Sequence, residues 1–194
     1  MPEQVQTQYN VTPGTGSVLD TVSADGIMSL GKQNAPLTIT LVTHPSCAYC
    51  RTFQEELLPR LRTDFIDTGL IKLQFIILPI QKYPESEMLH AAVQCAAAQQ
   101  KGFAVLNRLF EAPKTRDDLI KTAAAAGADE ALFTACLDRV PLSVTAEDTL
   151  IREFKVTLVP TVIVQSQASV GFPSYADLRG SIDEALQKYA SANR

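Results

Sequence analysis

The chain has 194 residues, a length that suits one domain or one domain that carries an insertion. Hydrophobic residues make up 46% of it and charged residues 20%, which is typical of a globular protein. Its formal net charge of −4 and its lack of a basic run argue against a general nucleic-acid-binding protein, so we expect no nucleic-acid partner. The longest apolar run, residues 73–80, is far shorter than the roughly 18 residues of a membrane-spanning helix.

The beginning of the chain is polar. It is rich in Gln, Thr, Ser and Gly and contains no apolar stretch like that of a signal peptide. We expect residues 1–25 to form a flexible N-terminal segment. Such a start fits a cytosolic protein, or the mature form of an exported protein that begins with an added methionine. The even number of cysteines, four, favours the exported form, because cysteines pair in oxidising compartments.

Strand and helix patterns follow this segment in order. The first three elements are a short strand at residues 26–30, a turn at 31–36 and a central strand at 37–43. Residues 47–65 have a helical pattern, with a kink expected at Pro59, which lacks a backbone donor. The apolar run at residues 71–78 predicts a strand covered on both faces, as in a parallel sheet with helices on each side.

From residue 83 to residue 154 the pattern is helical, with little β signal. Five helices are predicted, at residues 85–99, 101–110, 115–126, 128–138 and 143–154. Strand character then returns at residues 160–164 and 168–171, joined by a hairpin, and a last helix follows Ser174, a favoured N-cap residue. We therefore expect an α/β chain in which residues 26–82 and 155–194 form one domain and residues 83–154 form a helical insertion domain.

Cys47-Ala48-Tyr49-Cys50 joins the central strand to the helix that follows it. A C-x-x-C at such a junction is typical of a thioredoxin-type redox site, because the start of the helix stabilises the first thiolate. We expect Cys47 to be the nucleophile and Cys50, one turn later, to be the more buried resolving thiol. A structural metal half-site and inert core cysteines are the alternatives. A metal site needs two more ligands with similar spacing, and the remaining cysteines and histidines are scattered singly, so we expect no metal.

Two neighbours of the motif are candidate site residues. A charged His44 could bias the Cys47 thiolate, although a loop position at the rim of the site is the simpler interpretation. Tyr49 could contact a substrate or only pack on the surface.

The order of strand, C-x-x-C helix, strand, helical insertion, Val159-Pro160 and strand hairpin resembles the DsbA-like branch of the thioredoxin superfamily, the extracytoplasmic thiol:disulfide oxidoreductases of bacteria. The likeness runs from about residue 35 to residue 186. It implies a thioredoxin fold with a helical insertion between its β-α-β and β-β-α halves. It also implies a periplasmic or otherwise extracytoplasmic location, unfolded or reduced protein substrates, a membrane quinone-linked reoxidase, and no metal or organic cofactor.

The resemblance also implies roles for single residues. It implies a cis bond at Val159-Pro160, with the Val159 backbone pairing with substrate, whereas X-Pro bonds in general are cis in only about 6% of cases. It pairs Cys95 with Cys136 in a structural disulfide; two separate buried thiols are the alternative. The chain departs from the family at Leu41, where members often carry a buried acid, and at Ala48-Tyr49, where strongly oxidising members have Pro-His.

The function predicted from these observations is the introduction of disulfide bonds into unfolded proteins. A reductase or isomerase with the same site is the first alternative. We expect a monomer, because residues 1–25 are too short for the dimerisation domain that related isomerases carry. A peptide-binding or chaperone-like module without enzyme activity is the second alternative.

Overall fold

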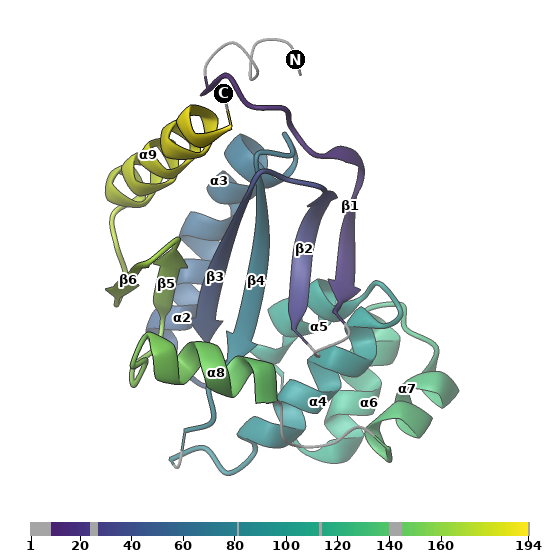
Figure 1. Cartoon of the computed structure of the whole chain (residues 1–194). Helices are drawn as coiled ribbons and strands as arrows, with labels where there is room; N and C mark the ends of the chain where they lie inside the picture. Colours follow the sequence, from purple (N-terminus) through teal and green to yellow (C-terminus); the bar gives the residue numbers. More distant parts are fainter. Residues whose placement is uncertain (1–8, 24–26, 81, 113, 140–144, 194) are drawn as a thin grey trace.

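Figure 1 shows the structure, a computed structural model. It describes residues 9–23, 27–80, 82–112, 114–139 and 145–193. The start of the predicted N-terminal segment, the first residue of the strand predicted at 26–30 and the start of the helix predicted at 143–154 lie outside these ranges. Within the described ranges, no helix is both long and apolar enough to cross a bilayer.

The centre of the molecule is a mixed sheet with the strand order β1-β2-β4-β3-β5-β6 (Figure 1). Its strands are β1 (Thr15–Val22), β2 (Met28–Gln33), β3 (Leu37–Thr43), β4 (Ile71–Ile77), β5 (Thr161–Val164) and β6 (Gln167–Val170). Of the strands in the described residues, only β3 and β4 pair in parallel, with Leu37 opposite Ile71, and the other neighbours are antiparallel. The prediction of a parallel sheet around residues 71–78 is therefore right for the pairing of β4 with β3 and wrong for its pairing with β2.

The prediction of a flexible segment is wrong for residues 15–22. These residues form β1, which pairs antiparallel with β2 and places Val22 opposite Met28. The polar composition hid this strand, because half of its residues are exposed to solvent and the backbone pairing with β2 supplies the order. Farther towards the N-terminus, Tyr9 is buried and its hydroxyl donates to a carboxylate oxygen of Asp183, 2.6 Å away.

The helices are α2 (Ala48–Thr52), α3 (Leu58–Leu61), α4 (Ser86–Ala97), α5 (Gly102–Leu109), α6 (Arg116–Ala125), α7 (Glu130–Leu137), α8 (Thr145–Glu153) and α9 (Tyr175–Ala192), with the π-helical turns η1 (Phe53–Leu57) and η2 (Arg62–Ile66) on either side of α3. The chain thus stays helical from residue 48 to residue 66. The kink expected at Pro59 stays a prediction. A π-helical turn precedes this proline, and at its end the Leu58 amide bonds to Phe53 O. A wider turn here suits a residue that has no amide hydrogen to donate.

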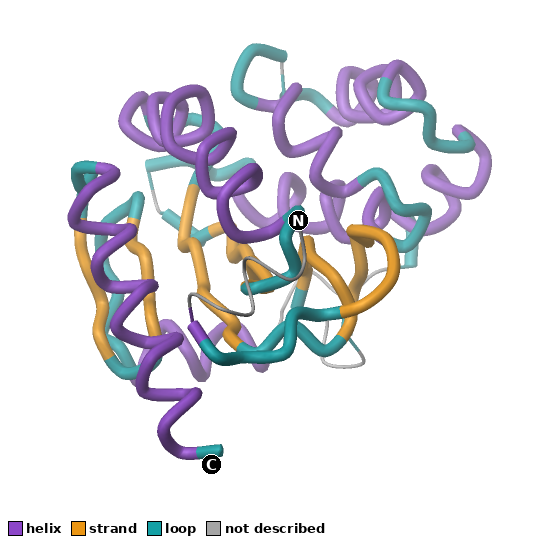
Figure 2. The backbone as a smooth tube through the Cα atoms, turned by 90° about the horizontal axis from the view of Figure 1, so that it is seen from above, coloured by secondary structure: helices purple, strands orange, loops and turns teal. Residues whose placement is uncertain are grey.

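Helices cover both faces of the sheet, as the view from above shows (Figure 2). Alternate residues of each strand point to opposite faces, so neighbours on β3 enter different cores. Leu41 lies in the larger core with side chains of the helix that follows Cys47 and of α9. Val42 lies in a smaller core, against Ile76 and hydrophobic residues of α8. This double coverage holds the C-terminal end of β3, where the C-x-x-C begins.

The helices α4 to α7 gather beside the β1 end of the sheet (Figure 1). Cys95 of α4 and Cys136 of α7 are joined by a disulfide bond, with Cα atoms 5.7 Å apart. Asp20 of β1 connects this group to the sheet, because its Oδ2 accepts a hydrogen bond from the Phe103 amide at the start of α5. The division of the chain into a thioredoxin-like domain and an insertion domain stays a prediction.

Candidate active site

Cys47 and Cys50 lie at the junction of β3 with the helix that follows. Cys47 is the N-cap of α2, and its Sγ accepts a hydrogen bond from the Cys50 amide, at 3.2 Å. An amide hydrogen that points at sulfur stabilises negative charge there. Both cysteines are free thiols in this structure, so the site has the geometry of the reduced form.

The two thiols differ in exposure. Cys47 is half-buried, whereas Cys50 is 1% exposed. Burial raises the pKa of Cys50, and its hydrogen bond with Cys47 raises it further, against weaker opposing hydrogen bonds from the His44 backbone and the Thr43 side chain. Cys47 is therefore the more accessible of the two thiols.

A loop from far along the chain lies beside Cys47. The Val159 carbonyl oxygen accepts a hydrogen bond from the Cys47 thiol, with sulfur and oxygen 3.6 Å apart. The Val159-Pro160 peptide bond is cis, and Pro160 is buried. The Gly171 amide donates to the Pro160 carbonyl at 2.8 Å, so the end of β6 supports this loop.

His44 does not lie at the rim of the site, and that prediction is wrong. Its side chain is 0% exposed, so it cannot touch a substrate on the surface. Burial lowers the pKa of His44 to about 4; nearby Lys114 lowers it further and Glu85 opposes the change. The ring is neutral near pH 7, which also excludes it as a positive charge beside the Cys47 thiolate.

Exposed apolar side chains lie on the segments that adjoin the accessible thiol. Tyr49, inside the motif, is 70% exposed, and Leu158, next to Val159, is 62% exposed. The hydrogen bond from Gly171 to Pro160 brings two further apolar residues to this loop. Val170 and Phe172 flank this glycine and are 61% and 38% exposed. Sequence reasoning found Tyr49 and missed the other three, since no local pattern shows that these segments meet.

At the position where family members often carry a buried acid, Leu41 is 2% exposed and packs in the larger core. The strands on either side place apolar Phe75 and Val162 opposite it. No carboxylate of this strand therefore handles the proton of Cys50. Among the described residues, no group of three or more His, Cys, Asp or Glu side chains is placed to hold a metal ion.

The helix that carries the cysteines is also attached to α5. Arg51 forms an ion pair with Glu111 at 3.0 Å and donates a hydrogen bond to the Phe110 carbonyl oxygen, while Gln54 donates to Asn107. Arg51 thereby satisfies a carbonyl at the end of α5, where a positive charge is favourable. These contacts cross about sixty positions of sequence and carry no local signal.

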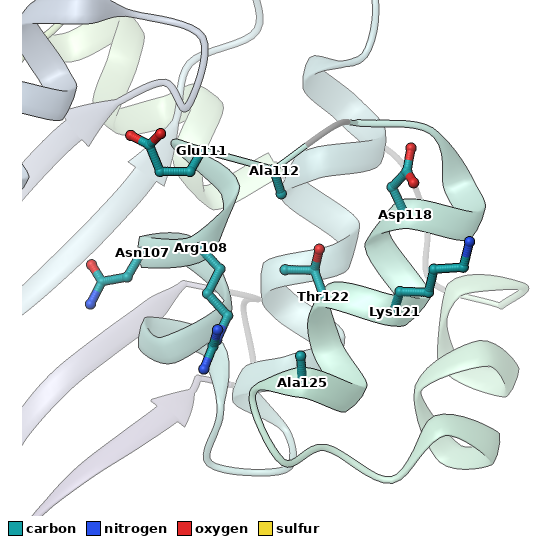
Figure 3. Close-up of a pocket in the computed structure, with 8 residues that line it drawn as sticks. All are labelled: Asn107, Arg108, Glu111, Ala112, Asp118, Lys121, Thr122 and Ala125. Carbon is teal, nitrogen blue, oxygen red and sulfur yellow. The ribbon is translucent and has the colours of Figure 1, made fainter.

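Behind these contacts, a cavity of about 580 Å³ lies between α5 and α6 (Figure 3). Thr122 and Ala125 of α6 point into the space between the helices, and Glu111 extends away from α6 (Figure 3). The cavity contains neither Cys47 nor any of the exposed apolar residues beside it. The cavity is thus separate from the thiol site. Its connection to the cysteine-bearing helix is through Glu111, which pairs with Arg51, and Asn107, which bonds to Gln54.

Comparison with known proteins gives one family and several structural relatives. The model of the family described as Thioredoxin matches residues 23–184. Disulfide bond formation protein D of Bacillus subtilis is 33% identical over 63 residues, which are 32% of this chain and 28% of that protein. The match thus spans less than a third of the length of that relative.

Two solved structures show the same fold. The oxidised BdbD of Bacillus subtilis superposes with a TM-score of 0.71 at 20% identity, covering 89% of this chain and 100% of that one. Alpha-DsbA1 of Wolbachia pipientis gives a TM-score of 0.72 at 16% identity, covering 89% of this chain and 97% of that one. The predicted DsbA-like thioredoxin fold is therefore confirmed.

Proposed function

The chain belongs to the thioredoxin family, and we propose that it is a thiol:disulfide oxidoreductase that exchanges a Cys47–Cys50 disulfide with protein substrates. The observation that carries this proposal is the pairing of a half-buried Cys47 thiol with a buried Cys50 whose amide donates to it. One thiol is open to a partner and the second is held next to it, which is the arrangement that exchange through a mixed disulfide requires.

In the forward direction, a substrate thiolate attacks Sγ of Cys47 in the disulfide form. The Cys47–Cys50 bond breaks, a mixed disulfide forms, and Cys50 leaves as a thiolate that takes up a proton because burial raises its pKa. A second substrate thiolate then attacks the substrate sulfur of the mixed disulfide and releases Cys47 as a thiolate. The substrate loses two electrons and gains a disulfide bond, and the two cysteines of the protein end reduced.

We propose net oxidation of substrates as the main direction. The Cys50 amide stabilises negative charge on Cys47, which favours the reduced pair and so makes the disulfide a better oxidant. The relative from Bacillus subtilis is named for disulfide bond formation, which agrees with this direction. A reductase or isomerase would use the same residues, so the reduction potential of the pair decides between them.

The substrates that suit this site are unfolded segments with apolar side chains. Tyr49 and Leu158 are exposed next to Cys47 and offer contacts to such side chains, while folded proteins keep theirs inside. The backbone of Val159, beside cis Pro160, is placed to meet the backbone of an extended peptide. Contacts of this kind select for disorder and apolar character more than for a particular sequence.

A turnover also needs an acceptor that returns Cys47 and Cys50 to the disulfide. We propose a membrane quinone-linked reoxidase for this step and an extracytoplasmic location for the protein. The Cys95–Cys136 disulfide supports the location, because structural disulfides persist mainly in oxidising compartments.

The test is the oxidation of a reduced, unfolded substrate protein by stoichiometric amounts of the oxidised chain, followed as loss of substrate thiols. Equilibration with glutathione buffers gives the potential in the same preparation. We expect fast thiol loss that vanishes in the Cys47→Ser variant. Slow oxidation with a strongly reducing potential would assign the protein to the reductases, and binding of unfolded substrate that survives replacement of both cysteines, with no thiol loss in the wild type, would make it a binding module.

A further inference from the structure

The turn that leads into Cys47 is held by a buried imidazole. The Cys47 amide donates to the His44 carbonyl oxygen at 3.0 Å, which closes a turn from His44 to Cys47. Inside this turn, the Ser46 amide donates to Nδ1 of His44 at 3.1 Å. The side chain of His44 thus organises the backbone of the residue that immediately precedes the nucleophile.

The other ring nitrogen connects the turn to a different part of the chain. Because Nδ1 accepts a hydrogen bond, the proton of the neutral ring is on Nε2, which donates to Ser86 Oγ at 2.9 Å. Ser86 lies at the start of α4, and its hydroxyl donates a hydrogen bond to the Tyr83 carbonyl oxygen, at 2.5 Å. The Tyr83 ring stacks on the imidazole, with centroids 4.7 Å apart.

A second bond runs parallel to this one. The Ser46 hydroxyl donates to Glu85 Oε1 at 2.9 Å. Glu85, the N-cap of α4, and Ser86, its first residue, thus both hold the same turn. All of these partners lie about forty positions from the turn in sequence. The turn before Cys47 is therefore held both by hydrogen bonds within residues 44–47 and by bonds to the start of α4.

We propose that His44 is a positioning residue for Cys47: its Nδ1 fixes the Ser46 amide, and through it the backbone that holds Sγ of Cys47 at the Cys50 amide. The inference rests on the proposed function only in taking Cys47 as the attacking thiol. The imidazole of His44 bonds to Ser46 and Ser86 and not to a sulfur atom, although the His44 backbone bonds to the Cys50 thiol. The ring acts through the turn, so its effect on the reactivity of Cys47 depends on how firmly the turn holds the Cys47 backbone.

The geometry excludes His44 as a general base for either cysteine. Both ring nitrogens are engaged and the ring is fully buried, so neither can receive a proton from a thiol without breaking the turn or the bond to Ser86. The charged groups that act on the ring are Glu85 and Lys114, and their effects oppose each other. A neutral ring with a single tautomer is what a fixed hydrogen-bonding scaffold requires.

Two substitutions separate the two nitrogens. In His44→Asn the amide oxygen takes the place of Nδ1 and can still accept from Ser46, but the bond to Ser86 is lost. In His44→Gln the amide nitrogen takes the place of Nε2 and can still donate to Ser86, but the Ser46 amide loses its acceptor. Ser86 keeps its bonds to Ile80 and Tyr83 in both variants.

The experiment measures the rate at which iodoacetamide alkylates Cys47 in the reduced full-length chain near neutral pH, by mass spectrometry of peptides, together with the thermal midpoint. We expect His44→Gln to react about five- to tenfold more slowly than the wild type, the factor that corresponds to one lost hydrogen bond. We expect His44→Asn to stay within about twofold of the wild type. Tyr175→Phe is the control, because it removes a hydrogen bond to Asp64 from the opposite end of the helix that carries the cysteines, and should lower the midpoint without slowing the alkylation.

Equal alkylation rates in both His44 variants and the wild type, with only the thermal midpoints lowered, would overturn the proposal and leave His44 a purely structural residue. A loss in His44→Asn as large as in His44→Gln would also overturn it, because the effect would not follow Nδ1. Alkylation needs no protein substrate. A wild-type chain that fails to oxidise proteins would therefore reject the proposed function and leave this comparison intact.

Discussion

The amide of Cys50 donates a hydrogen bond to Sγ of Cys47 across 3.2 Å, while the thiol of Cys50 itself is 1% exposed. The backbone of Cys50 thus bonds to the sulfur of Cys47, while the side chain of Cys50 is buried in the core. The asymmetry of the two thiols is a consequence of the helix, because one turn separates the cap position from the first buried position.

This asymmetry predicts which thiol an alkylating reagent modifies. In the reduced protein near neutral pH we expect Cys47 to be labelled first, since burial both hides Cys50 and raises its pKa, which keeps it protonated. Brief treatment with iodoacetamide and peptide mapping measure the ratio. Denatured protein is the control, in which both cysteines should react. Faster labelling of Cys50 in the folded chain would reverse the two roles.

Removal of the second thiol should trap the intermediate. In Cys50→Ser, a substrate joined to Cys47 has no resolving thiol next to it, so mixed disulfides should accumulate. They are expected as high-mass bands on a non-reducing gel that disappear on reduction. The Cys47 thiolate forms them by attacking an unfolded substrate whose single cysteine is held in a mixed disulfide with a small thiol, which is released. Cys47→Ser, in which Cys50 is buried, is the matched variant and should form few adducts. Equal adducts in both variants would contradict the assignment of Cys47 as the point of attack.

The exposed side chains beside Cys47 should contribute to substrate binding. Leu158→Ala is expected to raise KM for an unfolded protein by about fivefold with little change in thermal midpoint, because the side chain is exposed to a substrate and is not packed in the core. Leu132→Ala is the control, since this leucine of α7 is 63% exposed and Leu158 is 62% exposed. Steady-state kinetics measure both. A similar change in KM in the two variants would show that general surface hydrophobicity, not the loop beside Cys47, attracts the substrate.

The disulfide between α4 and α7 should stabilise the protein without taking part in exchange. Its cysteines are 41 positions apart, and a closed loop of that length is worth about 4 kcal/mol by chain entropy. Replacement of both Cys95 and Cys136 by Ala should therefore lower the free energy of unfolding by a few kcal/mol, measured in urea, and leave the rate of dithiol oxidation unchanged. If the rate falls while the stability stays the same, the second pair belongs to the redox cycle.

Asp20 should make stability depend on pH. Burial raises its pKa to about 6, although the Phe103 amide opposes the shift, and Oδ1 has no hydrogen-bond partner among the described residues. The folded chain thus binds this proton more tightly than the unfolded chain does. The contribution of Asp20 is fully present below its ordinary pKa of 3.8 and is lost as the pH rises through about 6.

Asp20→Asn isolates this effect, because Asn does not titrate and the other groups are common to both proteins. Between about pH 4 and about pH 7, the variant should gain about 2 kcal/mol in free energy of unfolding relative to the wild type. Urea titrations of both proteins at the two pH values measure the difference. A difference that does not change with pH would mean that the Asp20 carboxylate is solvated or paired in solution.

Local sequence patterns determined most of the secondary structure. The strands predicted at residues 37–43 and 71–78 are confirmed as β3 and β4, and the helices predicted within residues 85–138 are confirmed as α4 to α7 to within a few residues. These elements follow from the spacing of apolar residues and from caps such as Thr115, whose hydroxyl accepts from the Asp118 amide. The C-x-x-C also revealed itself locally, because a helix start and two cysteines one turn apart are contained in one short segment.

What only the tertiary structure decided is the surroundings of that motif. Strand β1 exists because β2 offers it a partner, and the buried imidazole of His44 finds its hydrogen-bond partner Ser86 42 positions away. Val159 reaches Cys47 from 112 positions away, and no pattern in either segment shows the contact. Burial, hydrogen-bond partners and substrate-facing surfaces are properties of segments that meet when the chain folds, whereas spacing and propensity act only over a few neighbouring residues.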